Sequence, residues 1–221
     1  MSADSNEFPT LKRAEDRPAD ESANLITHAL GFFLSVIASA VLMMLVVQYH
    51  QTINIIACGI YCCSLTGLYA ASMLSHMFYD LAWRRFFRTL DQVCIYLLIA
   101  GSYTPFAVVY LWHSWWPMLL VSMWVFAIFG VLLVLYMRNL TPMAMLTYGI
   151  LGWLPIISLK TLYDATPLDI FTWIIAGGFF YSAGSVFLIF DQRVRYFHAL
   201  WHTFAIAGST CHYIALLMVM L

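Results

Sequence analysis

Two histidines near the start of the last hydrophobic segment have the spacing of a helical metal site. His198 and His202 are four residues apart. On a helix this spacing places both side chains on one face, about 6 Å apart along the axis. Two imidazoles in this arrangement can bind one metal ion, as they do in helical zinc sites.

Three further polar residues accompany hydrophobic segments that precede these histidines. His76 ends one segment, with Ser72 four residues before it, and Asp91 begins the next segment. An ionisable side chain inside a bilayer costs roughly 3 kcal/mol, and such residues commonly mark functional sites. The pattern favours a metal site, although histidines that only form hydrogen bonds between helices would fit the same spacing.

The chemistry of such a site would be hydrolytic. Three histidines, His76, His198 and His202, together with one water molecule would complete an open tetrahedral zinc site. Zinc lowers the pKa of the bound water, and Asp91 could then accept its proton as general base. Ser72 could hold the water or orient the oxyanion.

The composition is that of an integral membrane protein. The chain has 221 residues, of which 63% are hydrophobic and 10% are charged, whereas soluble domains carry about 25% charged residues. The net charge is −1 and the sequence has no basic stripe. We therefore expect no nucleic-acid partner.

Seven windows are long and apolar enough to span a bilayer, which requires about 20 residues. They are residues 25–47, 52–78, 90–111, 116–137, 143–163, 169–190 and 198–220. We expect an all-α membrane protein: a seven-helix transmembrane bundle formed by residues 21–221 and preceded by a polar tail of residues 1–20. Pro105 and Pro155 lie inside two windows and predict kinks there.

The distribution of basic residues predicts the orientation. Nine of the ten Lys and Arg residues fall on one side of the predicted bundle, and the exception is Lys160. The nine are Lys12, Arg13, Arg17, Arg84, Arg85, Arg88, Arg138, Arg193 and Arg195. The positive-inside rule then places the N-terminus in the cytoplasm and the C-terminus outside. Ser72, His76, Asp91, His198 and His202 would all lie toward the cytoplasmic face.

Four motifs, in this order, resemble those of the hemolysin III family, the bacterial branch of the progestin and adipoQ receptor superfamily. They are Glu21-x-x-Asn24-x-x-x-His28, Ser72-x-x-x-His76, the segment from Leu90-Asp91 to Thr104-Pro105, and His198-x-x-x-His202 followed by Ser209-Thr-Cys-His212. The resemblance extends from about Glu21 to the C-terminus.

The resemblance implies seven helices with a cytoplasmic N-terminus, in a multi-pass protein of the bacterial inner membrane. It also implies a zinc ion held by His76, His198 and His202, with Ser72 and Asp91 alongside. The superfamily is linked to ceramidase-like, metal-dependent hydrolases of lipid amides. The family name reflects a cytolytic activity ascribed to bacterial relatives.

Three functions remain open on the sequence. The first is a zinc-dependent hydrolase of lipid amide or ester bonds. The second is a non-catalytic membrane-homeostasis or receptor-like protein with structural zinc and a lipid ligand. The third is cytolysis or pore formation. No span shows a repeated polar face that could line a water-filled channel, which argues against this function. The sequence does not predict the oligomeric state.

Three other motif residues have expected structural roles. Asn24 is a favoured N-cap type and would cap the first helix, and His28 would lie near the surroundings of the site. His212 is ten residues beyond His202, about 15 Å along the helix. We expect it to form a hydrogen bond to a neighbouring helix.

Overall fold

The computed structural model describes residues 18–113, 115–136, 141–191 and 193–221, and the expected polar tail lies almost wholly outside these ranges. Within them the chain is helical and has no β-strand. The elements are α1 (Pro18–Tyr49), α2 (Thr52–Met77), α3 (Leu81–Tyr110), α4 (Pro117–Tyr136), α5 (Thr141–Trp153), the 3-10 helix η2 (Leu154–Ser158), α6 (Leu159–Ala165), α7 (Leu168–Phe190) and α8 (Phe197–Met220).

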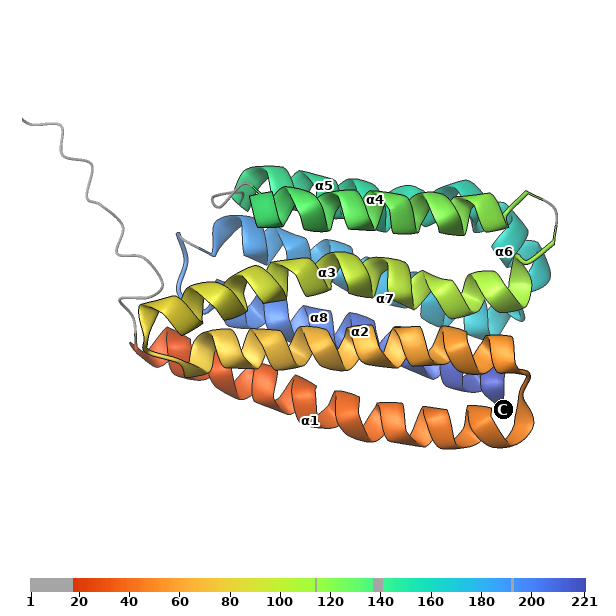
Figure 1. Cartoon of the computed structure of the whole chain (residues 1–221), viewed down its shortest axis with the longest axis horizontal. Helices are drawn as coiled ribbons and strands as arrows, with labels where there is room; N and C mark the ends of the chain where they lie inside the picture. The colour runs from red at the N-terminus through yellow and green to blue at the C-terminus, as the bar shows by residue number, and fades with distance from the viewer. Residues whose placement is uncertain (1–17, 114, 137–140, 192) are drawn as a thin grey trace, which may run out of the picture.

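Seven of the described segments are long and apolar enough to cross a membrane, with α5, η2 and α6 together forming the fifth. The helices run side by side along the long axis of the molecule (Figure 1). The start of α1 and the C-terminus lie at opposite ends of the bundle, as an odd number of spans requires. The prediction of a seven-helix, all-α membrane protein is confirmed. Which end faces the cytoplasm stays a prediction.

Two helices begin earlier than hydrophobicity predicted. The third helix begins at Leu81, where the Asp80 carboxylate caps it by accepting hydrogen bonds from the backbone N–H groups of Ala82 and Trp83. Arg84 therefore lies in the first turn of α3 and not in a connecting loop. A capped helix start needs backbone hydrogen bonds but no apolar side chains. The hydrophobic window therefore did not include the first turns of α3.

The first helix begins at Pro18, so Asn24 lies inside α1 and is buried. The expectation that Asn24 caps this helix is wrong.

Proline has different effects in two spans. In the fifth span the α-helix gives way to a 3-10 helix at Leu154–Ser158, which contains Pro155. This interruption agrees with the kink predicted there, because proline cannot donate the backbone hydrogen bond of a helix interior. In contrast, α3 continues past Pro105 to Tyr110.

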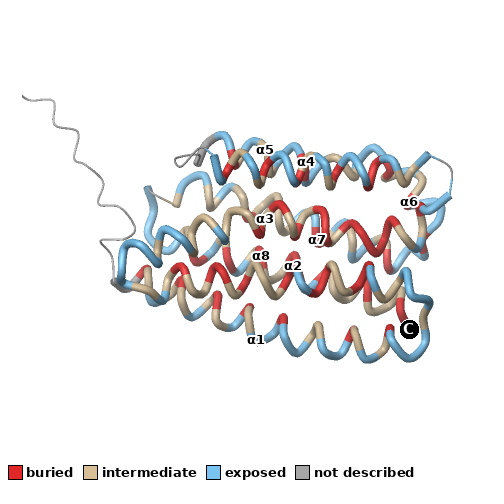
Figure 2. Tube along the Cα trace, in the orientation of Figure 1, coloured by how far each residue is buried: buried red, intermediate tan, exposed pale blue. Residues whose placement is uncertain are grey.

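The third helix joins two apolar clusters and is the most buried of the seven spans, as Figure 2 illustrates. One cluster lies between α3, α4 and α5 and includes Tyr96, Met123 and Leu151. The other lies between α1, α2, α3 and α8 and includes Leu42, Tyr61, Leu98, Phe106 and Leu216. Large apolar side chains also cover the outside of the bundle, for example Phe33, Val121 and Phe179. Such an exterior is stable in lipid but not in water.

The charge distribution predicts the result of a topology experiment. Alkaline phosphatase is active only outside the cytoplasm, and basic connections are retained inside. Phosphatase fused after Leu221 or Trp112 should be active, and phosphatase fused after Tyr79 should be inactive. The opposite pattern in the three fusions would overturn the assigned orientation.

A close helix contact predicts the effect of a small substitution. Gly130 of α4 lies directly against the ring of Tyr96, which is fully buried and shares a hydrogen bond of 2.6 Å with Thr147. A methyl group at position 130 would collide with this ring. Gly130→Ala should lower the free energy of unfolding by about 1–3 kcal/mol, measured by thermal unfolding in detergent.

Gly149→Ala in α5 is the matched control, because a β-carbon there meets nothing within 4 Å. An equal effect of the two substitutions would contradict the packing described for α3 and α4.

Candidate metal centre

Four histidines from three helices converge at one end of the bundle. His28 comes from α1, His76 from α2, and His198 and His202 from α8. The ligand atoms of His28, His76 and His202 all lie within 4.8 Å of one another. The ring centre of His198 is 4.3 Å from that of His202 and 5.5 Å from that of His76. The structure thus brings the three predicted histidines together and adds a fourth.

Carboxylates hold two of these rings from the side opposite the cluster. Nδ1 of His76 is 2.8 Å from a carboxylate oxygen of Glu21. Nδ1 of His198 is likewise 2.8 Å from a carboxylate oxygen of Asp191. Because a carboxylate accepts, each Nδ1 carries a proton and donates it. In each neutral ring the Nε2 lone pair then remains available to a metal ion.

His202 is held in a similar way by a hydroxyl group. Its Nδ1 is 3.2 Å from Oγ1 of Thr27. That hydroxyl donates its own proton to the backbone carbonyls of Ala23 and Asn24 at 2.9 Å, so it accepts from the imidazole. His202 is 2% exposed, and its Nε2 lone pair faces Nε2 of His28 at 2.7 Å.

His28 differs from the other three histidines. Its Nε2 is 2.7 Å from Nε2 of His202 and 2.8 Å from Oγ of Ser72. Its Nδ1 is buried and has no hydrogen-bond partner among the described residues, and the same holds for the side-chain oxygen of Asn24. The hydrogen bonds of His28 are therefore all at Nε2, and no carboxylate or hydroxyl fixes its ring from Nδ1 as in the other three histidines.

The two residues predicted to act on a substrate lie beside the histidines. Ser72 is 2% exposed and contacts His28. Asp91 is partly buried and lies close to the side chains of Ser72, His198 and Arg88. A serine, a carboxylate and several imidazoles thus share one site inside the helical bundle.

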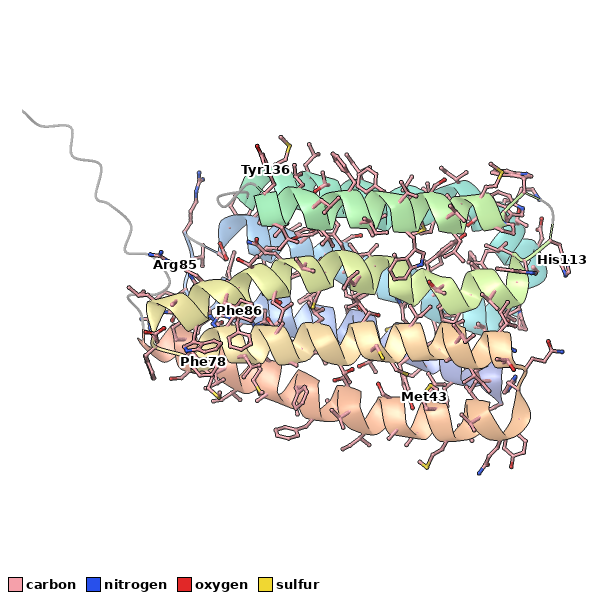
Figure 3. The ribbon with its side chains drawn as sticks, viewed as in Figure 1. Met43, Phe78, Arg85, Phe86, His113 and Tyr136 are labelled. Carbon is pink, nitrogen blue, oxygen red and sulfur yellow. The ribbon has the colours of Figure 1, made fainter. Side chains whose placement is uncertain are left out.

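The site lies where α2 ends and α8 begins, at the end of the bundle that carries Arg85 and Phe86 in Figure 3. A cavity of about 640 Å³ at the other end, near His113, is lined by none of the predicted site residues. His212 lies outside the cluster, and its Nε2 is 3.2 Å from the carbonyl oxygen of Ile174 in α7. The prediction of a hydrogen bond from His212 to a neighbouring helix is confirmed.

The donor set suits a metal ion of intermediate softness. Imidazole nitrogens favour zinc, copper, iron or nickel, whereas calcium and magnesium prefer oxygen. Two buried polar atoms, Nδ1 of His28 and the side-chain oxygen of Asn24, also lack a hydrogen-bond partner among the described residues. The described residues can therefore hold a metal ion, and the chemistry of their atoms fits one.

Sequence reasoning did not assign roles to Glu21, Thr27 or Asp191. Glu21 carried a usable signal, because it shares a sequence motif with His28. Thr27 carried none, since it meets His202 only through the packing of α1 against α8. Asp191 carried none either, because it meets His198 only through the path of the short connection from α7 to α8.

Comparison with known proteins gives a consistent result over most of the chain. The family model described as "Haemolysin-III related" matches residues 17–213. "Hemolysin-3" of Bacillus cereus is 34% identical over 203 residues, which cover 91% of this chain and 92% of the relative. "Hemolysin-3 homolog" of Bacillus subtilis (strain 168) is 32% identical, with 90% and 93% covered.

A more distant human relative, "Monocyte to macrophage differentiation factor", is 25% identical over 217 residues, covering 89% of this chain and 83% of its own. No solved structure matches the chain. The match to the family model and to two bacterial relatives covers nearly the whole helical bundle, and the chain therefore belongs to the haemolysin-III related family.

Proposed function

We propose that this multi-pass protein is a zinc-dependent hydrolase that cleaves an amide or ester bond of a lipid in the bacterial inner membrane. The observation that carries this proposal is that Ser72 contacts His28 and that the Asp91 carboxyl lies close to Ser72, beside the histidine cluster. Such a pair could position and deprotonate a water molecule next to a bound ion. Because the site lies within the membrane-spanning helices, the substrate would be a lipid.

We assign the zinc ligands to His76, His198 and His202. Metal-binding histidines nearly always donate their second N–H to a carboxylate, carbonyl or similar acceptor, which fixes the ring and raises its basicity. These three rings have such acceptors, whereas Nδ1 of His28 has none. His28, which shares the tightest histidine group, is the alternative third ligand.

The residues around the ligands have separate roles in hydrolysis. Bound zinc would supply a Lewis acid that polarises the carbonyl and acidifies a water molecule. Asp91 accepts the proton of the attacking water and returns it to the leaving amine or alcohol. Ser72, which contacts His28 and lies close to Asp91, positions the water or the developing oxyanion. The products are a fatty acid and an amine or alcohol.

The two possible ligand triads predict different metal contents. Purified wild type should contain about one zinc ion per chain, and His76→Ala, His198→Ala and His202→Ala should contain little. His28→Ala should retain zinc, as should His113→Ala at the far end of the bundle. Elemental analysis of the purified variants measures this directly.

A full zinc content in His198→Ala, together with a loss in His28→Ala, would contradict the assigned ligands. A wild-type protein without metal would contradict the function itself.

Hydrolysis predicts turnover that depends on Asp91. Purified protein in lipid nanodiscs should release fatty acid from ceramide-like amides or from lipid esters, as measured by mass spectrometry. Asp91→Asn removes the general base and should slow turnover by about 100- to 10,000-fold, with zinc retained. Asp164→Asn is the matched control, because Asp164 is exposed on α6 and pairs with Lys160.

No turnover of a broad lipid panel by zinc-loaded protein would refute the hydrolase. The non-catalytic role with structural zinc would then account for the site.

A further inference from the structure

Two carboxylates lie just outside the histidine cluster, and neither has an assigned function. We infer that Glu21 and Asp191 are positioning residues: they fix His76 and His198 for metal binding and provide negative charge near the ion. This inference rests on the proposed metal site. It extends that proposal to residues on α1 and at the end of α7 that do not touch the ion.

Both oxygens of Glu21 are already engaged. One lies 2.8 Å from Nδ1 of His76 and the other 2.6 Å from a guanidinium nitrogen of Arg84. The Glu21 side chain is 17% exposed, so water screens these contacts only in part. Both oxygens thus contact other partners, and Glu21 is not part of the group of close ligand atoms formed by His28, His76 and His202. Its contacts instead join α1, α2 and α3 at the ring of His76.

Asp191 acts on a more exposed ring. The side chain of His198 is 28% exposed, compared with 6% for His76. Packing therefore restrains His198 less, and its 2.8 Å contact with Asp191 is the main polar restraint that the structure shows. In the connection from α7 to α8, Tyr196 has a left-handed backbone with φ of 62°. Such a conformation costs about 1 kcal/mol for a residue other than glycine.

The charge of the ion gives a second reason for these carboxylates. A dication bound by three neutral imidazoles keeps its full charge in a region of low dielectric constant. Glu21, partly neutralised by Arg84, and Asp191 offset this charge through the histidines that they contact. Their removal should therefore weaken metal binding even if the rings kept their places.

The experiment compares Glu21→Gln, Asp191→Asn and the double variant of the full chain in nanodiscs. Affinity for Zn²⁺ is measured by competition with a chelator, and site geometry by the visible absorption of bound Co²⁺. Loss of such a contact typically weakens metal binding by about 10- to 100-fold. Because both carboxylates act on the same ion, the double variant should bind Zn²⁺ more weakly than either single variant. Asp164→Asn is again the control and should match wild type.

The outcomes separate this inference from the proposed function. If wild type binds neither Zn²⁺ nor Co²⁺, the metal site itself fails. If wild type binds and both variants stay within about twofold of its affinity, at the resolution of such comparisons, the positioning role is overturned and the metal site stands.

A role limited to tying helices together would give a different signature. The variants would then unfold at lower temperature without metal, while the Zn²⁺ affinity and the Co²⁺ spectrum of the folded protein stayed unchanged. That result would also overturn the inference. Each variant is a separate test, so a variant that fails to fold leaves the other to decide. Glu21→Asp, which keeps the charge, should recover part of the affinity lost in Glu21→Gln.

Discussion

The contact between α1 and α8 is the interaction on which the site depends. It brings Thr27 and His28 of α1 against His202 of α8, with 2.7 Å between the two Nε2 atoms of the histidines. Buried imidazoles inside a bilayer are costly unless their nitrogens find partners. At this contact most of the imidazole nitrogens have a hydrogen-bond partner. The two helices can therefore pack together with the polar groups between them.

The membrane explains why the rest of the bundle is regular and why its irregularities lie near the polar end. Backbone groups in lipid must be satisfied within the helix, so the spans differ mainly in their side chains. Apolar clusters joined by α3 form the core. Charged groups such as Glu21, Arg84 and Asp191 lie where α1 and α3 begin and α7 ends. A metal site at that end would have both a scaffold and counter-charges.

The convergence of His76, His198 and His202 at one end of the bundle was predictable from the sequence, because it follows from local rules. The spacing of His198 and His202 places them on one helix face, and an even number of crossings returns the chain to the end where His76 lies. The inclusion of His28 was not predictable in this way, since it requires α1 to pack against α8. Asp191 was missed because its contact with His198 depends on the path of the short connection from α7 to α8. The charged first turns of α3 were missed because hydrophobicity does not report a capped helix.

The central claim is that imidazoles of this chain hold a zinc ion within the membrane-spanning bundle. X-ray absorption at the zinc edge of the purified, full-length protein tests it most directly. The account predicts bound zinc with three nitrogen neighbours at about 2.0–2.1 Å and one or two oxygen neighbours. A shell of sulfur atoms, a shell of oxygen atoms alone, or no bound zinc would contradict it.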